Sequence, residues 1–289
     1  MKGKLFFIGI LTIIFLSSFS DAFAQLNLPR ESQRASVLQT IGDTNVSIIY
    51  HRPNAKNRKI WGELVPFGKV WRTGANEATL FEVVNDIKIN GQLLPKGKYS
   101  LHTIPNKDEW TIIFNKTWNQ WGSFNYDAKE DVLRVQAKPQ TADFQETMLI
   151  AFENVRATSA DAIIRWENVR VPFTVDVGDV NARTLTEIRK AMSNLKPDDF
   201  RSPREAANWI LEKKLAANYQ EALGWLDAGL KNSETYGLLF SKARLLAEMG
   251  KRAEAIAIAE RAVQVGKAAA PPANTSDLEK LLAAWKTGQ

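Results

Sequence analysis

The clearest fold signal in the chain is IKINGQLLPKGKYSLHTIP, which spans Ile87–Pro105. Asn90-Gly91 separates two short apolar runs, and this dipeptide is the strongest short hairpin signal because both residues tolerate a positive φ. Pro95-Lys96-Gly97 then turns the chain again into a third run that ends at Pro105. Short strands joined by tight turns predict an antiparallel sheet.

The same pattern extends outward from this stretch over residues 36–178, where β-branched and aromatic runs alternate with Gly, Pro and Asn. Eight or more strands at this spacing predict an all-β domain, a β-sandwich or jelly roll, with a closed barrel as the alternative. The predicted strands are Val46–Tyr50, Thr79–Val84, Ile87–Ile89, Tyr99–Ile104, Trp110–Asn115, Val132–Ala137, Thr147–Phe152 and Ala162–Val175.

After Asp179 the apolar period changes from two to between three and four, and Ala, Leu, Glu and Lys dominate. Residues 179–201 are predicted to be a helical connector, and residues 202–289 a small domain of helix-turn-helix units. Ser202-Pro203-Arg204-Glu205 has the form of a capping box with Pro at the first helical position, and Ser276-Asp277-Leu278-Glu279 repeats the box before the last predicted helix.

The helical half contains an internal repeat. YQEALGWLDAGL, beginning at Tyr219, aligns with RAEAIAIAERAV, beginning at Arg252, an offset of 33 residues. With Met249-Gly250-Lys251 before Glu254-Ala255-Ile256, these residues resemble tetratricopeptide repeats, although the proline that usually closes such a repeat is missing after Leu230 and Val263. The resemblance implies a peptide-binding or scaffolding surface. The alternative is that the helices only dock on the β domain and cover it.

The N-terminus carries an export signal. Lys2 and Lys4 precede an apolar run, and Ala22-Phe23-Ala24 places small residues where a signal peptidase reads them, so residues 1–24 are predicted to be a signal peptide cleaved after Ala24. Residues 25–35 are then an N-terminal segment. We expect a periplasmic or secreted protein, soluble after signal removal, with no transmembrane segment in the mature chain; a retained N-terminal anchor is the alternative.

The chain contains no cysteine, which excludes disulfides, a thiolate nucleophile and cysteine metal ligands. The formal net charge of +6 is spread along the chain without a Lys/Arg block, so the sequence does not predict nucleic-acid binding.

The β half carries an ordered series of motifs. They are YHRP at Tyr50–Pro53, NRKIWGELVPFGKVWRTGANEAT at Asn57–Thr79, LLPKGKYSLHTIP at Leu93–Pro105, EWTIIFNK at Glu109–Lys116, and Trp121-Gly122. Together they closely resemble the domain of unknown function 2911 family over roughly residues 34–177. His51 stands where that family is expected to have a small residue more often. The resemblance supports the all-β domain and implies no catalytic or binding residues.

The densest polar turn is LVPFGKVWRTGANEAT, Leu64–Thr79. Arg72 offers a planar fork for a carboxylate or phosphate, Thr73 and Asn76 add neutral hydrogen bonds, and Glu77 could orient the arginine or act as a base. The alternative, which we favour slightly, is an Arg72–Glu77 ion pair that closes the end of the sandwich. Further ligand-binding candidates from the β-domain motifs are His51, Arg52, Trp71 and His102.

The remaining candidate residues bear on two kinds of function, catalysis and ligand binding. His51 and His102 are the only histidines, and no metal-ligand spacing or Gly-x-Ser-x-Gly motif occurs, so we expect no metal, no cofactor and no serine hydrolase. Trp118 and Trp121 lie among Asn, Gln and Gly and are the best candidates for an exposed carbohydrate or peptide contact. The sequence thus favours a non-enzymatic exported binding or envelope-associated protein; the alternative is a glycan or peptide hydrolase that uses Glu77 with His51 or His102.

Overall fold

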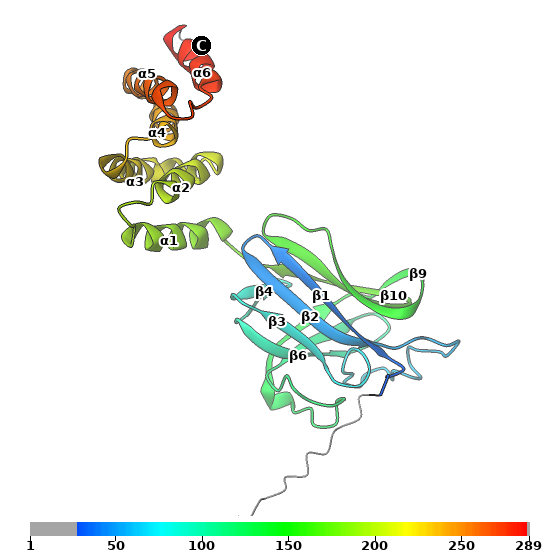
Figure 1. The fold of residues 1–289 in the computed structure, drawn as a ribbon. Coiled ribbons are helices and arrows are strands. Elements are labelled where there is room, and N and C mark those ends of the chain that lie inside the picture. Colours follow the sequence, from blue (N-terminus) through cyan, green and yellow to red (C-terminus); the bar gives the residue numbers. More distant parts are fainter. Residues whose placement is uncertain (1–27, 288–289) are drawn as a thin grey trace, which may run out of the picture.

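The computed structural model describes residues 28–287. An N-terminal β domain is followed by six α-helices, and the helices extend away from one end of the β domain (Figure 1). The expected order, an antiparallel all-β part and then a helical part, is confirmed. The predicted signal peptide and its cleavage site after Ala24 lie outside the described residues.

Six antiparallel strands form the first sheet, in the order β1-β2-β3-β6-β7-β8. The sequence pattern does not predict β1, because its side chains are mostly exposed or half-exposed and many are polar. The bounds are β1 Gln33–Ile41, β2 Thr44–Arg52, β3 Thr79–Val83, β6 Gly97–Ile104, β7 Trp110–Asn115 and β8 Asp131–Ala137.

Four strands form the second sheet, in the order β5-β4-β10-β9. Asn90 and Gly91 join β4 to β5 with φ values of 46° and 82°, which confirms the predicted hairpin. The two sheets remain separate, so the closed alternative is wrong. The bounds are β4 Ile87–Ile89, β5 Gln92–Leu94, β9 Gln140–Glu153 and β10 Ser159–Asp176.

The core lies between the inner faces of the two sheets. Alternate residues of the strands point inward, as Phe81 and Phe114 do from the first sheet and Phe173 does from the second, and the rings of Phe114 and Phe173 meet with centroids 6.2 Å apart. At one end, a cluster of four buried indoles joins the loop between β2 and β3 to the sheets. Its members are Trp61, Trp71, Trp110 and Trp166.

Strand β9 is an edge strand, but side chains of β2 satisfy part of its free backbone. The Tyr50 hydroxyl accepts a hydrogen bond from the Ile150 N–H at 2.9 Å and donates one to the Ile150 carbonyl at 3.3 Å. Arg52 Nε donates to the Met148 carbonyl at 2.8 Å. Arg52 therefore ties the two sheets together at this edge.

The outer face of the first sheet is covered by the connection between β7 and β8, here named the 116–127 loop. Gln120 Nε2 from this loop donates to the Ser100 hydroxyl at 3.2 Å, and the Tyr126 ring lies 5.1 Å from the His102 ring. Ser100 and His102 belong to β6 and are fully buried beneath the loop. The loop thus converts part of a sheet surface into a second, polar interior.

After α1, the helices form two pairs followed by a last helix. α2 packs against α3, and α4 packs against α5. α3 and α5 begin at Tyr219 and Arg252, so the 33-residue offset in the sequence corresponds to equivalent helices. The bounds are α1 Val180–Ser193, α2 Arg201–Glu212, α3 Tyr219–Asn232, α4 Tyr236–Glu248, α5 Arg252–Ala268 and α6 Ser276–Thr287.

Both predicted capping boxes are displaced. The Asp199 carboxylate accepts from the N–H groups of Arg201 and Ser202 and from the Ser202 hydroxyl, so an upstream acid caps α2 in place of Ser202. Before α6, the Thr275 hydroxyl contacts Glu279 at 3.1 Å, and Ser276 is already helical. A short polar residue one to three positions earlier competes for the same role in each case.

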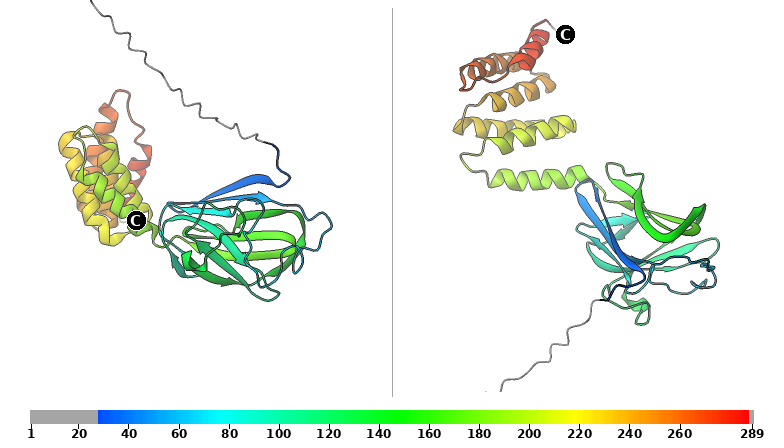
Figure 2. Two further views of the ribbon diagram at one scale, coloured as in Figure 1. Left: turned by 90° about the horizontal axis from the view of Figure 1, so that it is seen from below. Right: turned by 45° about the vertical axis from the view of Figure 1, so that its right-hand side comes forward.

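α1 carries the connection between the two halves. Arg183 donates to both carboxylate oxygens of Asp43, in the β1–β2 turn, at 2.9 and 2.6 Å, and Val180 packs on the β core. The later helices extend away from the sheets, so the expectation that the helices cover the sandwich is wrong (Figure 2). Within residues 28–287, no helix is long and apolar enough to cross a membrane.

Candidate functional site

A pocket lies on the outer face of the first sheet, between the segment that precedes β1 and the 116–127 loop. Its volume is about 620 Å³. The floor comes from β2 and β3, one wall from residues 28–34 and the other from residues 118–120. The lining residues are Leu28, Pro29, Arg30, Ser32, Gln33, Arg34, Ile49, His51, Glu77, Ala78, Leu80, Trp118, Asn119 and Gln120.

Strand alternation brings His51 to this pocket. Ile48 and Tyr50 point into the core, so Ile49 and His51 line the outer face, and the β1–β2 register pairs Arg34 with His51. The imidazole is buried except for a small exposed fraction. His51 is therefore fixed in the floor by the sheet itself.

Glu77 is held by the 116–127 loop. It forms an antiparallel bridge with Trp121, and on either side the Gly122 N–H donates to the Asn76 carbonyl and the Ala78 N–H to the Gln120 carbonyl, each at 3.0 Å. The preceding turn needs Gly74, because a Cβ there would lie 3.0 Å from the His51 carbonyl oxygen. The close approach of this turn to β2 is what brings Glu77 beside His51.

Glu77 has two basic neighbours. Arg30 Nη1 donates to both carboxylate oxygens, at 2.7 and 2.6 Å, and His51 Nδ1 lies 3.4 Å from Oε2. Partial burial opposes ionisation of Glu77, but the hydrogen bonds from Arg30 and the backbone and the nearby positive charges hold its pKa below the usual value. Burial lowers the pKa of His51 despite the carboxylate, so the imidazole is neutral at pH 7.

The predicted Arg72–Glu77 ion pair is wrong. Glu77 is engaged by Arg30, and within residues 28–287 Arg72 forms no ion pair. The competing partner, Arg30, lies 47 residues upstream, and no sequence pattern marks it as a neighbour of Glu77.

Two exposed tryptophans stand at the 116–127 loop. Trp118 lines the pocket and is 43% exposed, and Trp121 is 52% exposed. Lys98 Nζ lies 5.5 Å from the Trp118 ring centroid, and the Arg30 guanidinium lies 5.3 Å from that of Trp121. The expectation that these two indoles lie outside the core is confirmed.

Gln120, in the pocket wall, has a buried side-chain oxygen that is unpartnered within the described residues. Its Nε2 donates to the Thr117 carbonyl at 2.8 Å and to Ser100, which fixes the amide orientation. Its Oε1 is buried and has no hydrogen-bond partner within the part of the chain described here. An acceptor left in this state at a pocket wall suits a hydroxyl or amide donor from a ligand.

The other sequence candidates lie apart from this pocket. Thr73 is fully buried and its hydroxyl lies 3.1 Å from that of Thr103, while the Trp71 indole donates to the Gly74 carbonyl at 3.1 Å. Asn76 Nδ2 donates to the Ser32 carbonyl at 3.2 Å, which ties the turn to the segment before β1. Arg72 lines a smaller cleft on the other side of the turn.

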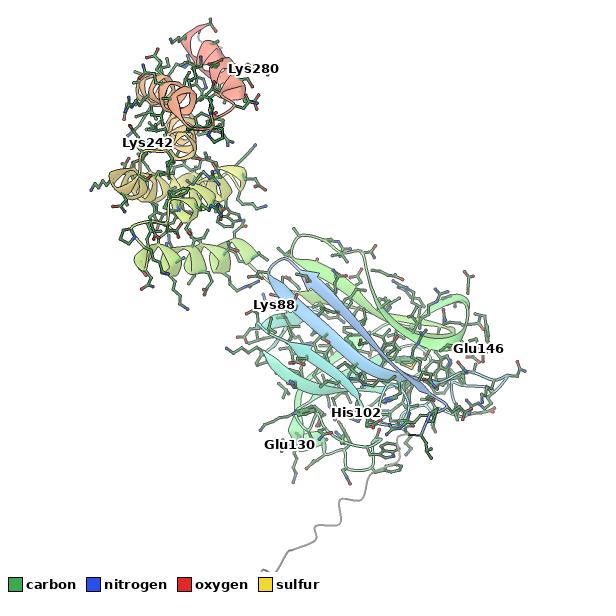
Figure 3. The ribbon with its side chains drawn as sticks, viewed as in Figure 1. Lys88, His102, Glu130, Glu146, Lys242 and Lys280 are labelled. Carbon is green, nitrogen blue, oxygen red and sulfur yellow. The ribbon has the colours of Figure 1, made fainter. Side chains whose placement is uncertain are left out.

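His102 belongs to the polar interior under the loop. It is completely buried, and neither ring nitrogen makes a hydrogen bond of normal geometry among the described residues. Figure 3 marks the place of His102 in the β domain. Burial lowers its pKa to about 4, with Asp131 opposing and Arg72 reinforcing the shift. His102 therefore does not join His51 and Glu77, and no group of three or more His, Asp or Glu in residues 28–287 is arranged to hold a metal ion.

The sequence analysis did not identify several polar residues of the pocket, among them Arg30, Arg34 and Gln120. Arg30 and Arg34 precede the predicted start of the β domain, and no pattern marks them as partners of residues near position 77. Gln120 lies between the two predicted tryptophans in NKTWNQWG, so the cluster of amide side chains around exposed indoles was the available signal.

Residues 32–175 match a family model described as protein of unknown function (DUF2911). The β domain is thus similar to that family, and the match covers both sheets and most residues of the pocket. No curated protein and no solved structure matched the chain. The DUF2911 match agrees with the motif resemblance in the sequence, and it assigns no activity.

Proposed function

We propose that this chain is an exported, non-enzymatic binding protein whose β domain holds a carbohydrate in the 620 Å³ pocket. The observation that carries the proposal is the composition of the pocket wall, which contains both the exposed apolar ring of Trp118 and the amide of Gln120, whose oxygen has no partner within the described residues. A sugar presents an apolar face and a ring of hydroxyls, which match these two features. Arg34 and Asn119 add donors at the rim.

Export is part of this proposal and is supported by the N-terminal sequence pattern, with its basic start, apolar run and small residues at Ala22 and Ala24. N-terminal sequencing of the protein recovered from the periplasm or medium tests it. Recovery of the protein only from the cytoplasm, beginning at Met1, would reject the export step.

The binding step is tested by screening the full mature chain on a glycan array, followed by calorimetry with the best oligosaccharide. Trp118→Ala should weaken binding roughly 5- to 30-fold, which corresponds to about 1–2 kcal/mol for a central aromatic contact. Phe144→Ala is the matched control, since Phe144 is an exposed aromatic outside the pocket. Equal losses in both variants, or no glycan bound by the wild type, would reject a carbohydrate site here.

The alternative function is a hydrolase acting on glycan or peptide. It is favoured by one contact, the 3.4 Å separation of His51 Nδ1 and Glu77 Oε2 at the floor of the pocket. In this mechanism a neutral His51, oriented by Glu77, accepts a proton from an attacking water. Product release from fluorogenic glycosides or a casein substrate, abolished by Glu77→Gln, would support it; activity that survives both Glu77→Gln and His51→Ala would exclude this site.

A partner-binding role for the helices is a further part of the proposal. A groove of about 460 Å³ lies along α2 and α4, lined by residues that include Asn208, Trp209, Tyr236 and Phe240. Side chains of this kind suit an extended peptide, as the resemblance to tetratricopeptide repeats implies. Pull-down with the full chain and with Phe240→Ala tests it, and unchanged recovery of the partner would remove the groove from the proposal.

A further inference from the structure

Arg72 is a cation without a counter-ion. Its Nε is buried and unpartnered, and within residues 28–287 no carboxylate, carbonyl or hydroxyl accepts a hydrogen bond from the side chain. The residue is half-buried, and burial lowers the pKa of the guanidinium. Holding the Nε–H donor of Arg72 out of water without an acceptor costs free energy, because this donor loses its hydration.

The carboxylate near this region is already occupied. Asp131 accepts from Asn115 on one oxygen and from Tyr126 and Arg134 on the other, at 2.6–2.8 Å. His102, the other polar neighbour, is neutral at pH 7. Within residues 28–287, Arg72 thus has no anionic partner, and Glu31, the carboxylate that lines the same cleft, is paired with Lys56.

The backbone fixes Arg72 in place without help from its side chain. Trp71 exchanges two backbone hydrogen bonds with Thr103, at 2.8 and 2.9 Å, and the Thr79 N–H donates to the Arg72 carbonyl at 3.2 Å. The backbone that carries the Arg72 side chain is therefore ordered in advance of any ligand, which lowers part of the ordering cost of binding.

Arg72 lines a cleft of about 230 Å³ that is separate from the larger pocket. Trp71 and Trp166 contribute to its walls, and Arg58 adds a second positive charge whose donors go to the carbonyls of Asn54 and Ala55. A third cation at the cleft, Lys56, is neutralised by Glu31. The cleft therefore has a net positive charge, with two guanidinium groups that have no carboxylate partner within residues 28–287.

We propose that this cleft binds an oxyanion, the carboxylate or phosphate group of a small solute, through the Arg72 guanidinium. The planar fork of arginine matches two oxygens of either group, and the surrounding indoles exclude water from the contact. The volume admits one such group with a short substituent and not a polymer chain. This site does not depend on the carbohydrate pocket, whose arginines are Arg30 and Arg34.

The test uses the full mature chain labelled with ¹⁵N, and follows the indole N–H signals of Trp71 and Trp166 during titration with sodium phosphate and, separately, sodium acetate. Sodium chloride at matched ionic strength is the reference. Saturable shifts with phosphate, acetate or both are expected, and the stronger of the two identifies the preferred group. Shifts that are equal with chloride, or absent with both oxyanions, overturn the proposal.

Variants of Arg72 separate the contribution of its positive charge from that of its two-point hydrogen bonding. Arg72→Gln should weaken oxyanion binding at least tenfold, and Arg72→Lys, which keeps the charge, should weaken acetate binding because it loses the two-point contact. Arg34→Gln is the matched control and should leave oxyanion binding unchanged while lowering binding in the larger pocket. Should Arg72→Gln fail to fold, Arg72→Lys decides; unchanged affinity in the folded variant overturns the proposal.

Discussion

The hydroxyl of Tyr50 offers a sharp test of how the two sheets are held together. Tyr50→Phe keeps the ring in the core but removes the acceptor for the Ile150 N–H. The phenol is 3% exposed, so water cannot readily replace it. A buried donor left without a partner costs about 1–3 kcal/mol, and the 3.3 Å bond to the Ile150 carbonyl adds little because it is long.

We therefore expect the free energy of unfolding of the β domain to fall by about 1–3 kcal/mol. With a urea m-value of about 2 kcal/mol per molar, the midpoint falls by about 0.5–1.5 M. Tryptophan fluorescence reports this domain because four of its indoles form one buried cluster. Hydrogen exchange at the Ile150 amide should also lose protection.

Tyr219→Phe is the control, since the Tyr219 hydroxyl has no hydrogen-bond partner within the described residues, and its effect should stay below about 0.5 kcal/mol. A midpoint shift below about 0.2 M in Tyr50→Phe, together with unchanged protection of Ile150, would refute the idea that this hydroxyl joins the sheets.

Three further predictions follow from single features. The pKa of buried His102 is lowered to about 4 from an unfolded value near 6.5. The free energy of unfolding should therefore keep the full contribution of neutral His102 above pH 6.5 and fall by a few kcal/mol as the pH drops towards 4. His102→Gln should flatten this part of the thermal-midpoint profile, and an equal slope in both proteins would contradict the assignment. Gly91→Ala should destabilise the hairpin by about 1–2 kcal/mol in urea, because φ is 82° with no neighbour near the added Cβ, whereas Gly91→Asn should cost less; equal costs would count against backbone strain. Asp43→Asn should change unfolding by less than about 1 kcal/mol but broaden the distance distribution in small-angle scattering, since it removes the ion pair to Arg183; an unchanged distribution would show that α1 is held by other contacts.

Local signals in the sequence predicted local structure well. Asn90-Gly91 predicted its hairpin because the two residues select the turn by themselves, and the predicted strand Trp110–Asn115 agrees with β7 because its apolar run is buried almost throughout. β1 escaped prediction because it is an edge strand with mostly exposed side chains, so burial imposes little pattern on it.

The candidate site was less predictable because it depends on pairings between distant segments. The sequence identified His51 and Glu77 as candidate residues. The ion-pair partner of Glu77 is Arg30, however, and Glu77 is positioned by a backbone bridge to Trp121 of the 116–127 loop. Similarly, Asp199 outcompetes Ser202 as a helix cap because both are suitable residues at neighbouring positions. Residue types indicated which side chains could form ion pairs or helix caps, whereas only the fold shows which of the competing partners does so.

One hairpin, formed by β1 and β2, links the pocket to the helical half. Asp43 in its turn forms an ion pair with Arg183 of α1, at the start of the helical half. His51, near the other end of β2, lines the pocket. Thr44 and His51 are seven steps apart along the extended strand, a span of about 23 Å. A solute in the pocket and a protein on the helices would therefore not collide, and the chain could hold both at once as an adaptor between them.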